Sequence, residues 1–230
     1  MFANFDFDVI RRSIGYLFLD GMTFTLMLTG LAALGGLIFG TLIALMRLSG
    51  FRLLGRVAGL YVDLIRSLPL VLVIFWFYFL VPYIGQWLTG ASQPIRVGAF
   101  TSSLVTFIMF EAAYFSEIMR AGIQSISKGQ PAAAQALGLT YSQTMRYIVL
   151  PQAFRNMLPV LLTQTIVLFQ DTSLVYVVSI TDFLGAASKV AQRDGRLVEM
   201  YLFAAAVYFI ISCAASYGVR RLQTRIAFVH

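Results

Sequence analysis

Long apolar runs alternate with short polar intervals along most of the chain. Five of these runs are long enough to cross a bilayer as a helix, which takes about 20 residues. They cover residues 21–46, 57–81, 97–119, 157–179 and 198–219. The alternation typical of a membrane β-barrel is absent, and helices satisfy their own backbone hydrogen bonds in lipid. The pattern predicts an all-α, polytopic membrane protein with five transmembrane helices in a single transmembrane domain, residues 1–230.

Small residues and a proline mark particular places in the first two predicted helices. Gly36 and Gly40 are four residues apart, and Gly55 and Gly59 repeat that spacing, which lets helices approach closely. We interpret both pairs as packing positions and not as pore-lining positions. Pro69 lies inside the second run and predicts a kink or break, because proline has no backbone N–H to donate.

Composition agrees with a membrane protein. The chain is 59% hydrophobic and 12% charged, with a mean hydropathy of +0.82, whereas soluble domains carry about 25% charged residues. The formal net charge of +7 therefore indicates topology before it indicates nucleic-acid binding. The single cysteine, Cys213, is expected to be buried, and the single histidine, His230, offers no histidine-based catalytic or metal site.

The cations divide unevenly between the two sides of the predicted helices. If helices 1, 3 and 5 end in the cytoplasm, ten cations lie inside and six outside. The inner set is Arg47, Arg52, Arg56, Arg120, Lys128, Arg146, Arg155, Arg220, Arg221 and Arg225; the outer set is Arg11, Arg12, Arg96, Lys189, Arg193 and Arg196. The positive-inside rule then predicts an outer N-terminus, a cytoplasmic C-terminus and a cytoplasmic loop over residues 120–156.

Residues 128–155 form the longest polar-leaning, basic interval, and they contain no Asp or Glu. We expect two short helices here, separated at Gly138, which can supply a left-handed C-terminal residue. Two pairs fit the capping-box pattern that opens a helix: Ser127 with Gln130, and Thr140 with Gln143.

Several charged residues lie in or near the apolar runs, where charge is costly and usually has a partner or a function. Asp63 and Arg66 are three residues apart, as are Glu117 and Arg120, and we favour a structural ion pair for each. A role of Asp63 and Arg66 in the transport path stays open.

Two acids have no local cation. For Glu111 and Asp171, a function or a long-range partner is expected. Gln164 and Asp171 share a helix face, and hydrogen-bonding groups lie at the same depth: Gln170, Thr172 and Ser173. Such a stripe suits a path for a small zwitterion; the alternative is hydrogen bonding between helices or subunits.

Known catalytic motifs are missing from the chain. Neither lysine, Lys128 or Lys189, follows a glycine, so no phosphate-binding loop is present. A Gly-x-Ser-x-Gly elbow and a His-Glu-x-x-His motif are also absent. We predict that the chain is not an enzyme and needs no cofactor, and that an ATP-driven role would require a separate ATPase. The alternative function is a stand-alone ion- or proton-coupled carrier that uses Glu111 and Asp171 as a relay.

The basic interval also carries a recognisable motif. Ala132-Ala133-Ala134 precedes Gly138, and Ile148, Leu150 and Pro151 follow at the spacing of the Glu-Ala-Ala…Gly…Ile-x-Leu-Pro pattern. The chain thus resembles permease subunits of binding-protein-dependent ABC importers, although Ala132 replaces the usual Glu. Glu111-Ala112-Ala113 is not this motif, because no glycine lies six residues after that Glu.

Other segments narrow the resemblance to polar amino-acid importers. The matching elements are Arg66-Ser67-Leu68-Pro69, Ser116-Glu117-Ile118, Arg120-Ala121-Gly122-Ile123, Leu150-Pro151-Gln152-Ala153 and Gln170-Asp171-Thr172-Ser173-Leu174. Among these importers, the segments around residues 169–177 and 193–195 are most similar to glutamate/aspartate permease subunits. The resemblance implies a type I ABC importer permease fold in a bacterial inner membrane.

The resemblance also implies partners and site residues. Expected partners are ABC ATPase subunits, a second permease subunit (identical or different), a periplasmic amino-acid-binding protein and membrane lipid, but no nucleic acid. The loop would dock on the ATPase through Ala132, Ala133, Ala134, Leu137, Gly138, Leu139, Ile148, Leu150 and Pro151. Because a methyl group cannot pair with an Arg, we expect packing by Ala133, Leu137 and Leu139 instead of a charge pair at Ala132.

The candidate path residues are Arg66, Glu111, Gln164, Gln170, Asp171, Thr172 and Ser173. Arg66 also occurs in relatives that carry other amino acids, so it does not by itself explain acidic specificity.

Overall fold

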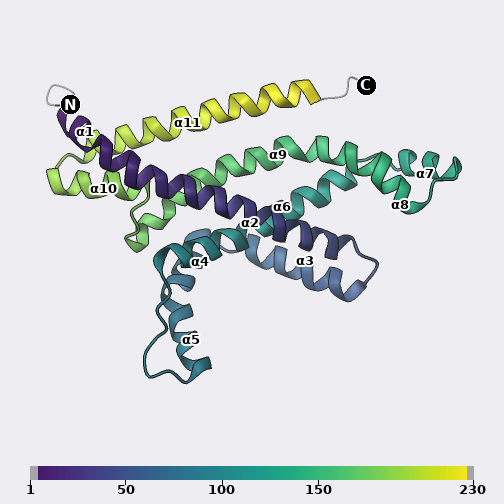
Figure 1. Ribbon diagram of the computed structural model, residues 1–230, viewed down its shortest axis with the longest axis horizontal. Helices are drawn as coiled ribbons and strands as arrows, with labels where there is room; N and C mark the ends of the chain where they lie inside the picture. Colours follow the sequence, from purple (N-terminus) through teal and green to yellow (C-terminus); the bar gives the residue numbers. More distant parts are fainter. Residues whose placement is uncertain (1–4, 227–230) are drawn as a thin grey trace. The chain divides into compact units, whose positions relative to one another are not determined.

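The computed structural model describes residues 5–226, so His230 lies outside the described part (Figure 1). Every regular element in this part is helical. The α-helices are α1 (Phe7–Gly15), α2 (Thr23–Leu48), α3 (Arg52–Arg66), α4 (Leu70–Phe75), α5 (Val81–Thr89), α6 (Ala99–Gln124), α7 (Gly129–Ala136), α8 (Tyr141–Thr144), α9 (Leu150–Asp171), α10 (Phe183–Asp194) and α11 (Leu197–Ile226). Short π-helical or 3-10 segments join some of them: η2 (Tyr16–Met22), η3 (Trp76–Leu80), η4 (Met145–Val149) and η5 (Thr172–Val178).

Five helical stretches are long and apolar enough to cross a membrane, which confirms the predicted number. They are Phe7–Leu48, Leu70–Thr89, Ala99–Gln124, Tyr141–Val178 and Leu197–Ile226. Only the stretch that contains α6 is more than half buried, at 56% against 11–28% for the others. The other four therefore offer mostly apolar surface to lipid or to protein partners. Cys213 on α11 is exposed, so the expectation that it is buried is wrong.

Pro69 breaks the second predicted span. α3 ends at Arg66, and Pro69 has extended backbone (φ −61°, ψ 128°) directly before α4. Proline lacks the N–H that would continue the helix, and it disfavours helical backbone at the preceding Leu68. The predicted range 57–81 is therefore wrong as a single span, and the spanning stretch begins at Leu70.

The described residues divide into two compact units. The first contains the described residues through Leu34, together with Leu68–Ile108 and Val167–Ala214. The second contains Gly35–Ser67, Met109–Ile166 and the described residues from Ala215 onward. The helices α2, α6, α9 and α11 contribute residues to both units.

The first unit has two hydrophobic clusters. One cluster packs α10 against η2 and α11, with Leu17, Phe183 and Met200 fully buried. The other surrounds Phe107 and Leu168. α10 begins at the buried residue Asp182, whose carboxylate accepts hydrogen bonds from the N–H groups of Leu184 at 3.0 Å and Gly185 at 2.9 Å. Burial raises the pKa of Asp182 to about 6, although these hydrogen bonds act in the opposite direction.

In the second unit, α2 packs closely on α6. A Cβ at Gly36 would lie 2.5 Å from the Cβ of Glu111, and one at Gly40 would lie 2.9 Å from that of Phe115. These distances confirm that Gly36 and Gly40 are packing positions. A Cβ at Gly59 would meet nothing within 4 Å, so the same interpretation of Gly59 is wrong, whereas one at Gly55 would lie 3.7 Å from the Arg47 carbonyl oxygen, at ordinary packing distance.

Candidate functional site

The 120–156 loop contains a short helix that ends at a left-handed glycine. Gly138 follows α7 with φ +86°. Its N–H donates to the Gln135 carbonyl at 2.9 Å, and the Leu139 N–H donates to the Ala134 carbonyl at 3.1 Å. These bonds satisfy carbonyls at the end of the helix. The predicted break at Gly138 is confirmed.

Only one of the two predicted capping boxes is formed. The Gln143 N–H donates to Thr140 Oγ1 at 3.3 Å, and the Thr140 N–H donates to Gln143 Oε1 at 2.9 Å. At the start of α7, by contrast, Lys128 is the residue before the helix and already has helical backbone. Ser127 Oγ accepts from the Gly129 N–H at 3.4 Å and not from Gln130. The prediction of a capping box at Ser127 is therefore wrong.

The second predicted helix of the loop is not short. From Tyr141 the helix continues through α8, η4 and α9 to Asp171 (Figure 1). Pro151 does not stop it: the wider π-helical turn η4 lies just before this proline, which has no N–H to donate. The loop therefore consists of one short helix, a turn and the first part of a long helix.

Most of the predicted docking residues are exposed. Leu137 is 83% exposed, and Ala132, Ala133, Gly138, Leu150 and Pro151 are also exposed, while Leu139 and Ile148 are half-buried. Ala134 differs from the rest because it is buried where α7 packs on η4, as is Val149. Ala134 therefore supports the loop from inside and does not present a surface to a partner.

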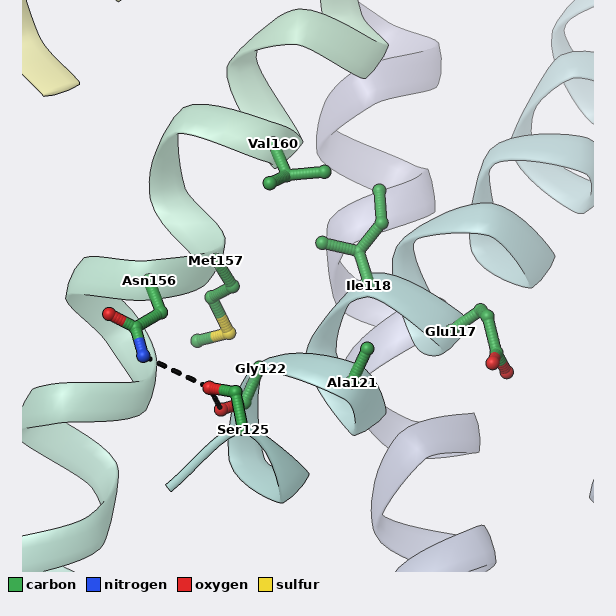
Figure 2. A pocket seen from close by; sticks show the side chains of 8 residues that line it. All are labelled: Glu117, Ile118, Ala121, Gly122, Ser125, Asn156, Met157 and Val160. Atoms are coloured by element: carbon green, nitrogen blue, oxygen red, sulfur yellow. Dashed lines mark hydrogen bonds between the residues drawn. The ribbon is translucent and has the colours of Figure 1, made fainter. Parts of the chain in front are cut away.

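The two ends of the loop are held together at its base. A Cβ on Gly122 of α6 would lie 2.9 Å from the Cβ of Met157 on α9. Nearby, the Asn156 amide donates to Ser125 Oγ at 2.9 Å (Figure 2). A largely apolar pocket of about 310 Å³ lies at this base. Its lining residues are Glu117, Ile118, Ala121, Gly122, Ser125, Asn156, Met157 and Val160.

Beside this base, one carboxylate holds two arginines. Arg47 on α2 approaches Glu117 on α6 at 2.5 Å, and Arg120 Nε donates to Glu117 at 3.2 Å. The predicted Glu117–Arg120 pair is confirmed, but the sequence analysis missed Arg47. A signal was present, because Arg47 follows Gly40 by seven residues and so shares the α2 face that packs on α6.

Two of the predicted path residues meet in the second unit. Glu111 is 3% exposed, and the Gln164 amide donates to its Oε1 at 3.3 Å. The Gln164 amide on α9 is thus one long-range partner of Glu111, as expected, and it is neutral.

Arg66 does not pair with Asp63. Its guanidinium lies 5.2 Å from the ring centre of Tyr114 on α6, a cation–π arrangement. No ion pair joins Asp63 to Arg66, although both residues lie in the described part of the chain. The favoured structural pair is therefore wrong.

The other path candidates lie at the end of α9 and the start of η5, in the first unit. The Gln170 amide donates to Ser212 Oγ on α11 at 2.9 Å, and the Thr172 hydroxyl donates to the Phe169 carbonyl at 2.7 Å. Gln170 thus makes the helix-to-helix contact that was the alternative to a path role. Asp171 and Ser173 are half-buried beside them.

The helical architecture and the five apolar stretches define a multi-span membrane protein. The family profile described as "Binding-protein-dependent transport system inner membrane component" matches residues 36–227, and the chain belongs to this family. Membership in this family disfavours the alternative function, a stand-alone ion- or proton-coupled carrier. It also agrees with the prediction that the chain is not itself an enzyme.

Individual relatives cover nearly the whole chain. The chain is 54% identical over 226 residues to the glutamate/aspartate import permease protein GltK of Escherichia coli O6:H1, covering 97% of this chain and 99% of that protein. It is 33% identical over 222 residues to the glutamine transport system permease protein GlnP of Escherichia coli K12, covering 96% and 98%. A solved structure described as an amino acid ABC transporter with histidines superimposes with a TM-score of 0.86 at 33% identity, covering 96% of this chain and 98% of that one. The chain is therefore a multi-pass inner-membrane permease of the amino-acid ABC transporter type.

Proposed function

We propose that this permease forms the translocation path for a polar amino acid and that glutamate and aspartate are its substrates. The observation that carries the proposal is the 54% identity, over almost the full length, to a permease described as importing these two amino acids. Relatives described as glutamine permeases are more distant, at 33–34% identity. The gap in identity favours acidic amino acids over their amides.

We further propose that the 120–156 loop docks on a separate ABC ATPase subunit. Its surface supports this role, because Leu137 is exposed on a loop that carries exposed cations and no acid: Lys128, Arg146 and Arg155. A lone exposed apolar side chain carries little weight by itself, but Tyr141 and Tyr147 of the same loop are exposed as well. With Ala at position 132, packing by Ala133, Leu137 and Leu139 would bear the contact.

We propose that the contacts at the base of the loop transmit motion from a docked ATPase to the transmembrane helices. Gly122 packs on Met157, and Asn156 bonds Ser125, so the two ends of the loop are tied together. A force applied at α7 would therefore move α6 and α9 as a pair instead of bending the loop. Glu117 would extend this coupling to α2 through Arg47.

The proposed assembly contains two permease subunits, identical or different, with two ATPase subunits and a periplasmic amino-acid-binding protein. We propose that the N-terminus lies outside and the C-terminus in the cytoplasm, on the charge distribution of the sequence. This orientation places the 120–156 loop on the same side as the ATPase.

Within the path, we propose that Glu111 and Gln164 contact the amino acid during transport, with Arg66, Asp171 and Ser173 as further candidates. The carboxylate of Glu111 can accept from an ammonium group, and the amide of Gln164 can donate to a carboxylate. Gln170 and Thr172 are weaker candidates, because Gln170 bonds Ser212 and Thr172 bonds a backbone carbonyl.

Reconstitution tests the proposal. The permease, the candidate ATPase and the candidate binding protein would be incorporated into liposomes, and uptake would be measured against a panel of amino acids. The expected result is ATP-dependent uptake of glutamate and aspartate above glutamine and histidine. Uptake that persists without ATP and collapses with an uncoupler would contradict it and restore the stand-alone carrier.

A further inference from the structure

A second pocket, of about 460 Å³, lies within the first unit and includes none of the candidate path or docking residues. It is formed by the end of η5, the turn after it and one face of α10. Its lining residues are Tyr176, Val177, Ser179, Ile180, Gly185, Ser188, Lys189 and Gln192. The volume lies within the range of pockets that hold small molecules, about 300–1,000 Å³.

The backbone around this pocket is unusual. Ser179 is the only residue other than glycine with positive φ in the described part of the chain, at +62°. Its N–H donates to the Tyr176 carbonyl at 2.9 Å. On the floor, a Cβ at Gly185 would lie 2.4 Å from the Ile180 carbonyl oxygen, so a larger residue cannot stand there. A costly conformation at Ser179 and an obligatory glycine indicate a constrained shape.

The charge of the pocket comes from Lys189. No Asp or Glu lines the pocket. The ammonium group of Lys189 donates to the neutral hydroxyl of Thr181, and none of the ion pairs among residues 5–226 includes it. Nearby arginines differ, because Arg193 pairs with Asp194 and Arg196 pairs with Glu199.

Neutral polar groups complete the lining. The Gln192 amide donates to Ser188 Oγ at 3.0 Å, and Ser188 Oγ lies 3.1 Å from the Tyr201 hydroxyl. Hydroxyl and amide oxygens can accept from an ammonium group, whereas Lys189 can only donate. A ligand with a carboxylate near Lys189 and an amino group elsewhere would give Lys189 an acceptor and give the neutral oxygens of the lining a donor.

We propose that this pocket binds an acidic amino acid through a carboxylate on Lys189. The proposal rests on the proposed function, and it adds a site at which the permease itself prefers a negative substrate. One unneutralised cation and no lining acid favour a net negative amino acid over its neutral amide. On the proposed topology, Lys189 is on the outer side, where the amino acid would arrive from the binding protein.

Lysine acylation tests the site, because the chain has only two lysines. The purified importer assembly, without binding protein, would be treated with an N-hydroxysuccinimide acetate ester, and adducts at Lys189 and Lys128 would be quantified by mass spectrometry. Because free amino acids also consume the ester, protection is read as the ratio of Lys189 acylation to Lys128 acylation. Sodium glutamate at three times its Kd is expected to lower this ratio about fourfold, since about three-quarters of the sites are occupied. Glutamine, or sodium chloride at equal ionic strength, should leave the ratio nearly unchanged. Lys128 on the loop serves as the internal reference.

Several results would overturn the proposal. Equal protection of Lys189 by glutamate and glutamine would do so, as would equal protection of Lys128. Protection by the empty binding protein alone would assign the surface to a protein contact instead.

In uptake assays Lys189→Gln should lower the rate at limiting glutamate several-fold, with Arg11→Gln as a control for loss of one exposed cation. If acylation is insensitive to glutamate while the assembly still imports it with ATP, the pocket proposal fails and the proposed function stands. If no acidic amino acid is imported, the proposed function fails.

Discussion

The side-chain amide of Gln164 donates a hydrogen bond to the buried carboxylate of Glu111, with 3.3 Å between nitrogen and oxygen. The two residues are 53 positions apart in the sequence and belong to different helices. Gly36 makes room for this arrangement, because any side chain there would collide with the Cβ of Glu111. A buried carboxyl group, a neutral donor and a close helix contact thus meet at one place in the second unit.

Replacing Gln164 tests whether this place belongs to the transport path. Gln164→Leu removes a hydrogen bond to a buried carboxyl group, and leaving such a group without this partner costs about 1–3 kcal/mol. If the pair contacts the amino acid, uptake should fall about tenfold or more with membrane insertion unchanged. Thr163→Val is the matched control, since the Thr163 hydroxyl bonds only the Pro159 carbonyl of its own helix. Equal uptake by the two variants in proteoliposomes would remove the path role.

Gly138 should be sensitive to any substitution. Its φ of +86° costs a residue with a Cβ about 1–2 kcal/mol. Gly138→Asp is therefore expected to leave insertion intact but to uncouple ATP hydrolysis from uptake. Gly129→Asp adds the same charge to the same loop without a left-handed backbone, and it should retain more coupling. Normal uptake in Gly138→Asp would contradict the docking role of the loop.

Substitutions at Leu137 and Val149 test the surface of the loop and its interior separately. Leu137 is 83% exposed and Val149 is 4% exposed. Leu137→Ser should change the free energy of unfolding by less than about 0.5 kcal/mol but weaken capture of the ATPase subunit. Val149→Ser should destabilise the protein by roughly 2 kcal/mol. Both are measured by thermal unfolding in detergent and by co-purification, and unchanged ATPase capture by Leu137→Ser would rule out the contact.

Two glycines of α2 form a matched pair for helix packing. Gly36→Ala places a methyl group 2.5 Å from the Cβ of Glu111 and should destabilise the protein by about 1–3 kcal/mol. Gly30→Ala meets nothing within 4 Å and should be neutral, or stabilising by up to about 1 kcal/mol. Thermal melting in detergent distinguishes the two, and similar melting temperatures would contradict the close packing of α2 on α6.

Asp182 should make stability depend on pH. Its pKa in the folded protein is about 6, above the ordinary value of 3.8, because burial disfavours the charged form. The folded state therefore binds more protons between these values, and its stability should fall as pH rises from about 4 to 6. The full effect approaches about 3 kcal/mol. Asp182→Asn removes this titration, so the wild type should lose stability relative to the variant over this interval. A constant difference in melting temperature from pH 4 to 7 would contradict the raised pKa.

Local features were predictable from the sequence because they depend on residues three to six positions apart. Gly138 ends α7, Thr140 and Gln143 form a capping box, and Pro69 breaks the helix. Five apolar stretches were predictable from length and hydropathy alone. The ends of the helices were less predictable. No local signal showed that the helix continues through Pro151, because this continuation depends on the π-helical turn that precedes the proline.

The sequence by itself determined the class of protein, the number of spans and the place of the basic loop, since each follows from hydropathy, charge and local backbone preference. Only the tertiary structure decided which polar groups meet. Arg47 reaches Glu117 across 70 positions, Gln170 reaches Ser212 across 42, and Arg66 lies on Tyr114 instead of pairing with its neighbour Asp63. The pocket around Lys189 likewise exists only once η5 turns back onto α10. Such pairings depend on how helices pack, and packing is set by the shapes of many side chains together.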